Sequence, residues 1–436
     1  MPRIAVALSG GGHRAALFGL GALLYLADSG KSREVESIAS VSGGSLTNGY
    51  IAQSADYRSI QSPEFRTAVT PFTRRLAQRG TVWPPAPLTL AYLVLLILVL
   101  LAIVGVWLLP WSVGLRALAF VVGLVVLGVV ASWRGLVVSR AFAKSLYSPK
   151  GSPTALSAIT TSLDHVFCAA DLHAGENVYF SGGFVCSYRF GWGSPGGLPL
   201  HVAVQCSAAL PGAMPPRWLK VGPHHFVEGR PEAKDASRMA LVDGGVYDNM
   251  ADQWGLEITK RKSRWPERAK GLRETDELII VNASAGLEWQ PVWKIRLPLI
   301  GEILALLKDK TVLYDNGNAV RRELAVDRFR AGPLRGALVH IPRSPLFVAD
   351  AYAKGSDEAA DRARTVIQLL KPERSGWEAT AKRNAKVSTS LSRMGVPVAA
   401  DLLQHGYVLA MANLHVILDY PLLDVPSRES FEAMLR

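Results

Sequence analysis

Short apolar runs alternate with glycine-rich turns and helical patterns over most of the chain. Ile4 to Leu8 and Glu277 to Ala283 are apolar runs of the kind that buried parallel strands need, and Ile38 to Val41 reads as another short strand. His13 to Leu26 places leucines on one side at helical spacing. Ala240 to Val242 reads as the tip of a further strand. This alternation predicts an α/β fold.

The C-terminal part continues the same pattern. Leu299 to Leu324 is mostly helical in pattern, and Ala337 to Ile341 reads as a short strand. Arg374 to Leu391 is polar and basic, and Val396 to Ala412 has the pattern of an amphipathic helix. We expect these elements to complete the outer layers of the sheet, with residues 346–436 as a mainly helical extension packed on the same domain.

One region breaks this pattern because it is apolar throughout. Leu88 to Leu109 contains 22 residues without a charge, which as a helix would be about 33 Å long and enough to span a bilayer core. A second uncharged run ends at Trp133 and becomes long enough if its helix begins near Val113. We predict a two-helix transmembrane hairpin over 88–133, with spans at about 88–109 and 113–133. The alternatives are two buried helices of a soluble core, or a hairpin lying on the membrane surface.

Basic residues lie on both sides of this predicted hairpin, and its turn offers only Arg116. The positive-inside rule then places both flanks in the cytoplasm. We therefore expect a multi-pass membrane protein with two spans, whose catalytic domain and both termini lie on the cytoplasmic side. The flanking basic residues are Arg74, Arg75, Arg79, Arg134, Arg140, Lys144 and Lys150.

Composition narrows the class of protein. Only 19% of the 436 residues are charged, which excludes disorder as the main state. The net charge of +12 would suit nucleic acid, an anionic membrane surface or an anionic substrate. Because the chain has no zinc-finger spacing, RNA-binding aromatic signature or long Lys/Arg run, we predict no nucleic-acid partner. The cysteines Cys168, Cys186 and Cys206 form no CxxC pair, so we expect buried thiols, no metal and no cofactor.

Three consecutive glycines follow the first strand. Gly10, Gly11 and Gly12 free the backbone to turn its N–H groups towards one point, and the helix N-terminus behind them adds positive potential. The loop therefore predicts an anion cradle, either for a phosphate or for the oxyanion of acyl transfer. A plain glycine-rich turn has the same pattern. The sequence lacks the Walker lysine and the spacing of the dinucleotide fingerprint.

A second sharp turn carries a serine. The segment from Ser40 to Gly44 runs from strand to helix and is similar to the nucleophile elbow GxSxG, with Ser40 in place of the first glycine. Ser42 stands at the apex, whereas Ser45 lies inside the helix. Gly43 would offer its N–H to an oxyanion. The alternative is a serine that caps the helix N-terminus.

A serine nucleophile needs an adjacent base. None of the nine histidines lies in a recognisable Asp/His context. Asp243 is the better candidate, because it precedes two glycines at the end of a strand, where open α/β sheets place their sites. An aspartate that bonds its own turn backbone is the alternative. Asp248 and Asn249 read as turn or support residues, and nothing beyond Asn282 looks catalytic.

Taken in order along the chain, these motifs resemble the patatin-like phospholipase family. The resemblance rests on the GGGxR loop, the serine elbow about 30 residues later and the segment from Val242 to Asn249. Two further segments agree in order: Ala169 to Leu172 followed by Gly175, and Cys206 to Gly212 followed by Pro215 and Pro216. The elbow leans towards the cytosolic phospholipase A2 variant of this fold, and Ala15 replaces the glycine usual after the loop arginine. The resemblance covers about residues 4–52 and 153–292.

This resemblance implies a three-layer α/β sandwich with a mostly parallel central sheet, and a Ser–Asp dyad in place of a triad. Ser42 would be the nucleophile and Asp243 the general base. Arg14 could steer or hold a phosphate headgroup, but packing against the loop or pairing with a carboxylate fits it equally well. The residues implied for the oxyanion hole are Gly10, Gly11, Gly12 and Gly43.

The expected organisation follows from these motifs. Residues 1–80 and 150–345 would form the two parts of the catalytic domain, on either side of the hairpin at 88–133. The expected function is hydrolysis of an ester bond in a phospholipid or lysophospholipid of the membrane, with the oligomeric state left open. Two alternatives remain: a non-catalytic membrane protein that holds a phosphate-containing ligand at the glycine loop, and an acyltransferase that uses the same dyad.

Overall fold

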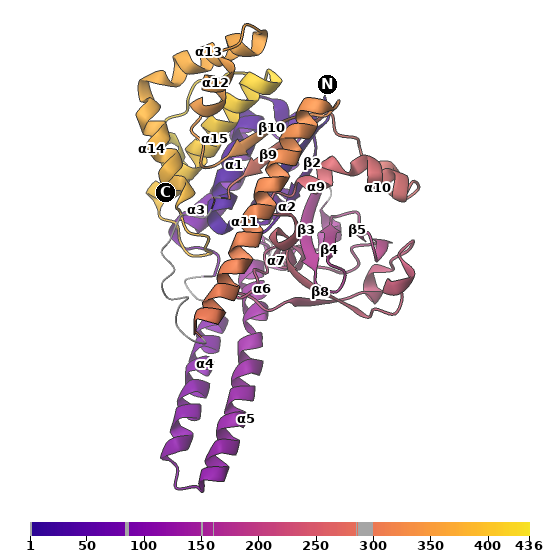
Figure 1. Cartoon of the computed structure of the whole chain (residues 1–436), viewed down its shortest axis with the longest axis vertical. Coiled ribbons are helices and arrows are strands. Elements are labelled where there is room, and N and C mark those ends of the chain that lie inside the picture. The colour runs from indigo at the N-terminus through magenta and orange to yellow at the C-terminus, as the bar shows by residue number, and fades with distance from the viewer. Residues whose placement is uncertain (1, 83–86, 150, 160, 285, 287–299) are drawn as a thin grey trace.

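A computed structural model describes residues 2–82, 87–149, 151–159, 161–284, 286 and 300–436 (Figure 1). Lys150, the last basic residue predicted to flank the hairpin, lies outside the described residues. So do Leu299, where a helix was expected to begin, and residues 287–292 at the end of the predicted resemblance.

One mixed sheet runs through the body of the protein, in the strand order β10-β9-β1-β2-β3-β4-β5-β6, with β8 paired to both β3 and β7. Strands β10, β9, β1, β2 and β3 pair in parallel. The remaining pairings are antiparallel. Parallel pairing, which was expected for most of the central sheet, is thus found on one half of the sheet only. The bounds are β1 Ile4–Leu8, β2 Val35–Ser40, β3 Asp164–Asp171, β4 Glu176–Phe180, β5 Val185–Ser187, β6 Gly191–Gly193, β7 Arg217–Lys220, β8 Arg238–Asp243, β9 Glu277–Asn282 and β10 Arg335–His340.

Helices cover both faces of the sheet, because its strands are apolar on both sides. Along β1, Ile4, Val6 and Leu8 belong to one buried cluster, whereas Ala5 and Ala7 belong to another. The first cluster includes residues of α1 (Gly12–Asp28), α2 (Gly43–Ser54) and α15 (Val396–Leu418). The second includes residues of α9 (Asp252–Leu256) and α10 (Ile258–Arg264).

The described residues form further helices besides these. The cysteines Cys168, Cys186 and Cys206 are free and buried, as expected. The further helices are α3 Ser62–Gln78, α6 Arg134–Ser145, α7 Leu200–Ser207, α8 Gly245–Asp248, α11 Ile300–Ala331, α12 Leu346–Tyr352, α13 Glu358–Leu370, α14 Arg374–Ala385 and α16 Arg428–Leu435.

Helix α15 differs from its expected pattern. The spacing of Leu402, Leu403, Val408 and Leu409 predicts an amphipathic helix, but ten consecutive residues, His405–Leu414, are buried. It packs closely on α1, and a Cβ on Gly406 would overlap the carbonyl oxygen of Phe18. Because helices also cover its outer side, α15 is a central helix rather than a surface one.

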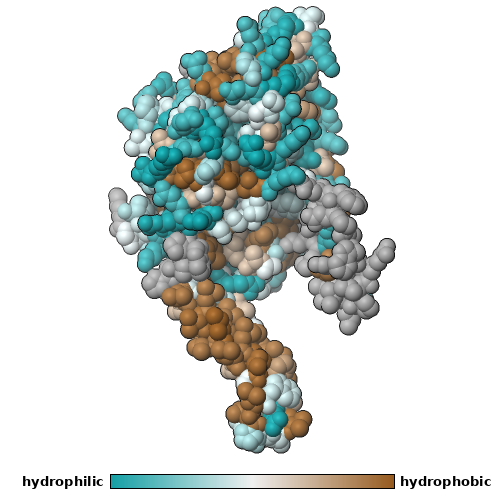
Figure 2. Space-filling model, turned by 90° about the vertical axis from the view of Figure 1, so that its left-hand side faces the viewer, coloured by the Kyte–Doolittle hydropathy of each residue, from teal (hydrophilic) through white to brown (hydrophobic). Residues whose placement is uncertain are grey.

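Two apolar helices extend away from the body, side by side (Figure 1). These are α4 (Pro87–Gly105) and α5 (Val113–Ser132), and most of their large side chains are exposed. The segments Thr89–Leu108 and Val113–Ser145 are long and apolar enough to cross a membrane. Apolar surface covers this projection along most of its length (Figure 2).

Candidate active site

The elbow and the Asp-Gly-Gly turn meet at one edge of β3. β2 pairs with this strand up to Ser40, which lies opposite Phe167, and β8 pairs antiparallel with it, with Asp243 opposite Ala169. The other edge of β3 is taken by β4. Since a strand has only two hydrogen-bonding edges, β2 and β8 share one edge and their ends face each other. Ser42, two residues beyond the end of β2, is therefore brought to the level of Asp243.

Ser42 adopts a backbone conformation that few residues other than glycine accept, with φ 51° and ψ −116°. Such a conformation costs roughly 1–3 kcal/mol and persists where the surroundings impose it. The side chain of Ser42 is half-buried and caps no N–H of α2. The elbow conformation is thus present, and the predicted capping alternative is not.

Ser207, at the end of α7, holds the two turns together. Its backbone carbonyl accepts the N–H of Ser42 at 3.0 Å and that of Gly244 at 3.3 Å. Its hydroxyl oxygen also accepts the Ser42 N–H, at 3.2 Å. One carboxylate oxygen of Asp243 accepts the N–H of Gly245 at 2.8 Å, so the turn role considered for this aspartate is present as well.

The glycine loop packs directly on the elbow. A Cβ on Gly43 would overlap the backbone oxygen of Gly12, and a Cβ on Gly44 would overlap the carbonyl of Leu8. The first overlap explains why small residues are needed beside the serine. Gly11 and Gly12 have φ values of 140° and 59°, which turn the backbone between strand and helix.

The N–H groups expected to bind an oxyanion differ in their availability. Gly10 donates its N–H to the carbonyl of Asn249 at 3.0 Å, so this donor is occupied. In the described part of the chain, the N–H groups of Gly11, Gly12 and Gly43 have no such acceptor. Three of the four expected donors therefore remain for a ligand.

The side chain of Arg14 makes contacts within the protein. Its side chain is buried beside Gly11, and its guanidinium donates to the carbonyl oxygens of Val387 at 2.6 Å and Ala385 at 3.3 Å. Burial lowers the pKa of Arg14. These bonds tie the loop to the segment after α14, so in this structure Arg14 packs against the loop and pairs with no carboxylate in the described residues.

A chain of buried hydroxyl groups lies beneath the elbow. The Ser45 hydroxyl bonds to those of Ser207 at 2.8 Å and Ser40 at 2.9 Å. The Ser40 hydroxyl also donates to the carbonyl of Val166 and accepts from the amide of Asn48. Ser40, which replaces the first glycine of the elbow motif, thus belongs to a buried hydrogen-bond network that supports the turn.

Two side chains near the site were not expected to be functional. Asn249 is buried, and both polar atoms of its amide lack a hydrogen-bond partner among the described residues. A Cβ on Gly10 would overlap the Oδ1 of Asn249. The hydroxyl of Tyr314, on α11, lies 3.2 Å from the position of a Cβ on Gly245. Desolvation of the hydroxyl and the nearby Asp243 carboxylate raise the pKa of Tyr314.

A buried ionic cluster anchors α11 beside the site. Arg321 lies 3.1 Å from a carboxylate oxygen of Asp248 and 2.9 Å from one of Asp252. Asp248 also accepts the N–H of Met250 at 3.1 Å, which is the turn role expected for it. Burial and the neighbouring Asp248 raise the pKa of Asp252 to about 8.

Histidine takes no part in this arrangement. The ring of His13, the histidine nearest in sequence to the loop, bonds to Thr81 and Ser392, and burial lowers the pKa of His13 to about 4. No histidine hydrogen-bonds to Ser42 in the described part of the chain. The described residues also contain no cluster of three or more His, Cys, Asp or Glu side chains that could hold a metal ion.

Comparisons with known proteins give distant structural matches. No protein-family model and no curated protein matches the chain. The human GIVD cytosolic phospholipase A2 aligns with 65% of this chain and 46% of its own, at 12% identity and a TM-score of 0.38. VipD from Legionella pneumophila aligns with 100% and 88%, at 13% identity and a TM-score of 0.28. The chain therefore spans about half the length of the first of these proteins.

Proposed function

We propose that this protein is a membrane-bound serine hydrolase that cleaves ester bonds of phospholipids or lysophospholipids. The observation that carries the proposal is the meeting of Ser42, at a strained turn, with the end of β8 at Asp243. A serine at such a turn is exposed to a substrate, and a carboxylate at the facing strand end can act as its base.

The reaction would proceed through an acyl-enzyme. Asp243 accepts the proton of the Ser42 hydroxyl while Oγ attacks the ester carbonyl. The N–H groups of Gly11, Gly12 and Gly43 stabilise the oxyanion, and one such donor is typically worth about 10²–10³ in rate. The proton then passes from Asp243 to the leaving alcohol. Water, activated by the same carboxylate, releases the fatty acid and restores Ser42.

The position of the hairpin supports a substrate drawn from a membrane. α5 leads through Trp133 directly into α6, whose Gly135 carbonyl accepts from the side chain of Gln205 at 2.8 Å. Ser207 lies two residues after Gln205 on α7 and accepts the backbone N–H of Ser42 in the elbow. Both helices of the hairpin join the body at the same end (Figure 1). We propose that the hairpin spans the bilayer, with the catalytic body and the basic flanks on the cytoplasmic side.

The decisive experiment compares wild type with Ser42→Ala and Asp243→Asn. Each protein is purified in detergent, incubated with a fluorophosphonate probe and assayed on short-chain aryl esters and on phospholipid micelles. We expect labelling and hydrolysis in wild type, no labelling in Ser42→Ala and strongly reduced hydrolysis in both variants. Ser32→Ala, at a buried serine in the turn before β2, is the matched control. Equal hydrolysis in all four proteins would refute the proposal.

Two other functions would use the same loop, and experiments on the same samples distinguish them. Phosphate-ligand binding without labelling of Ser42 would favour a non-catalytic binding protein. Transfer of the acyl group to an added lysolipid, in preference to water, would favour an acyltransferase with the same dyad.

A further inference from the structure

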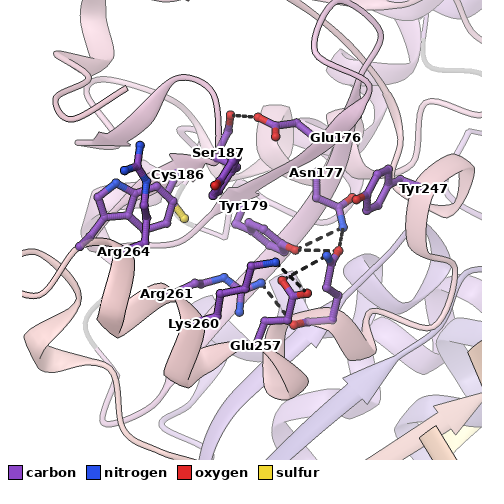
Figure 3. A pocket seen from close by; sticks show the side chains of 13 residues that line it. Glu176, Asn177, Tyr179, Cys186, Ser187, Tyr247, Glu257, Lys260, Arg261 and Arg264 are labelled. Carbon is purple, nitrogen blue, oxygen red and sulfur yellow. Dashed lines mark hydrogen bonds and ion pairs between the residues drawn. The ribbon is translucent and has the colours of Figure 1, made fainter. Parts of the chain in front are cut away.

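A pocket of about 180 Å³ lies between strands β4 and β5 and the helices α9 and α10 (Figure 3). Neither Ser42 nor Asp243 lines it, and its wall carries charged side chains, among them Glu257, Lys260 and Arg264. Because acyl chains need apolar surroundings, this pocket does not suit a lipid whose ester lies at Ser42. Apolar surface beside the candidate active site is found instead in the loop between α7 and β7.

This loop, residues 208–216, is apolar although part of it is exposed. It contains alanine, leucine, proline, methionine and one glycine, and no charged, hydroxyl or amide side chain. Leu210 exposes 41% of its surface, and Ala213 is also exposed. Trp218, two residues beyond the loop, is 54% exposed. A run of exposed apolar residues is unfavourable in water, so it indicates a surface that contacts something apolar.

The first half of the loop contacts the candidate active site. The carbonyl of Ala209 accepts the backbone N–H of Asp243 at 3.0 Å. Ser207, just before the loop, accepts the backbone N–H of Ser42 at 3.0 Å. Leu210 therefore follows directly after the residues that hold both turns of the site.

The second half of the loop contacts the chain where the hairpin joins the body. Nε of Arg134 donates to the carbonyl oxygen of Ala213 at 3.0 Å. A Cβ on Gly135 would lie 3.1 Å from the ring of Pro215. Arg134 and Gly135 begin α6, and Trp133 is the residue between α5 and α6. The loop thus lies at the level where the hairpin ends, within a few residues of the site.

Aromatic and basic residues mark this level as the edge of a bilayer that the hairpin would span. Trp133 is 46% exposed, and the hydroxyl of Tyr92, near the start of α4, donates to the carbonyl of Ala131 at 3.4 Å. Tryptophan and tyrosine are enriched where the hydrocarbon core meets the lipid headgroups, and arginine can extend its charge towards those headgroups. Since Arg134 also bonds to the loop, the loop lies at headgroup depth.

We propose that the loop of residues 208–216 contacts the bilayer and forms an apolar path from the leaflet to Ser42. This inference rests on the proposed function and adds to it the way in which the substrate enters. The substrate is a lipid held in the bilayer, whose ester reaches Ser42 while its acyl chains remain on apolar surface. Leu210 contacts these chains, and the bond between Arg134 and Ala213 keeps the loop against the hairpin.

The first test places a polarity-sensitive fluorophore on the full-length protein in vesicles of phosphatidylcholine and phosphatidylglycerol. The cysteines of the chain are buried, so one introduced cysteine is labelled selectively. Leu210→Cys and Ala213→Cys report on the loop, and Leu101→Cys, on α4, reports on the hairpin. Leu369→Cys, at a partly exposed apolar position of α13, is the matched control, because α13 lies at the end of the body away from the hairpin (Figure 1).

Lipids that carry a spin-label quencher on the acyl chain should cause loss of fluorescence at Leu210→Cys and Ala213→Cys, but not at Leu369→Cys. Loop positions quenched no more than Leu369→Cys, with Leu101→Cys quenched, overturn the inference and leave the proposed function intact. Absence of quenching at Leu101→Cys as well contradicts a spanning hairpin and overturns both. Blue-shifted emission from the loop without quenching by lipid indicates a protein partner and overturns the inference.

The second test compares substrates. Leu210→Asp places a carboxylate where an apolar side chain would contact lipid. The rate on vesicle phospholipid, divided by the rate on a soluble short-chain aryl ester, should therefore fall about three- to tenfold. Leu369→Asp should keep the wild-type ratio. If Leu210→Asp does not fold, Ala213→Asp takes its place.

An unchanged ratio in the loop variant overturns the inference. Wild-type protein that cleaves neither substrate contradicts the proposed function, and the path to Ser42 fails with it even where the loop is quenched.

Discussion

The candidate active site and the apolar hairpin contain similar small and apolar residues. These residues are closely packed by the rest of the chain at the site but not in the hairpin. At the site, a Cβ on Gly43 would overlap the backbone of Gly12, because one turn packs directly on the other. In the hairpin, a Cβ on Gly128 would meet nothing within 4 Å. The site is therefore fixed by contacts within the chain, whereas most of the large side chains of the hairpin are exposed. The same kind of substitution should act differently in the two regions.

Gly43→Ala should have the largest effect. The added methyl group must displace the glycine loop, so we expect loss of ester hydrolysis by at least about 10²-fold and destabilisation of roughly 1–3 kcal/mol. Gly128→Ala should leave both quantities unchanged. Denaturant unfolding and aryl ester hydrolysis in detergent measure the two effects. Wild-type activity in Gly43→Ala would show that the loop and the elbow are not held as tightly as the structure places them.

A charge in the hairpin tests the other side of the comparison. Leu101 is 62% exposed, so Leu101→Lys should not disturb the folded body in detergent. In a bilayer, a lysine at a helix centre costs about 2.5–3.5 kcal/mol, so insertion should fall strongly. The fraction of protein resistant to alkaline extraction from membranes measures this. Leu369→Lys, at a partly exposed position of α13 in the body, is the matched control and should extract like wild type. Unchanged extraction of Leu101→Lys would contradict a spanning hairpin.

The two regions also differ in how well the sequence predicts them. The strand at Ile4–Leu8 has the predicted bounds, and the two apolar helices agree within a few residues, because each depends on a local pattern. The meeting of Ser42 with Asp243 depends on β2 and β8 sharing an edge of β3, and β4 to β7 are too short and irregular to predict that sheet. The place of Asp243 before two glycines at a strand end suggested it as the base, and the order of the motifs supported this through resemblance.

Long-range contacts explain the remaining differences. Tyr314 reaches the site from a helix far along the chain, and no local motif marks it. Arg14 was considered for a phosphate because of its place beside the glycines, but carbonyl oxygens from a distant segment take its guanidinium. The sequence does mark Asn249, because this residue ends the segment that contains the Asp-Gly-Gly turn. Only the fold, however, brings its side chain against Gly10.

Ser207→Ala should sharpen the account of the site with a smaller effect. It removes a hydroxyl that accepts the Ser42 N–H and bonds to Ser45, but leaves the backbone carbonyl in place. We expect a loss of about 0.5–1.5 kcal/mol in stability and a several-fold lower kcat with KM unchanged, since the elbow is positioned less firmly. Ser32→Ala should change neither. A rise in KM alone would assign Ser207 to substrate binding rather than to positioning.

The buried carboxyl group of Asp252 should make the stability of the body depend on pH. The pKa of Asp252 is raised to about 8 in the folded protein, against an ordinary value of 3.8. The folded state therefore holds a proton that the unfolded state releases between about pH 4 and pH 8. The stability from this group is complete below pH 4 and is lost as pH rises towards 8, with a slope of at most about 1.4 kcal/mol per pH unit. Asp252→Asn mimics the protonated carboxyl and keeps an oxygen for Arg321, so its free energy of unfolding should vary less with pH between 5 and 8. Denaturant unfolding in detergent at several pH values measures this, and identical slopes in the two proteins would show that Asp252 is ionised beside Asp248.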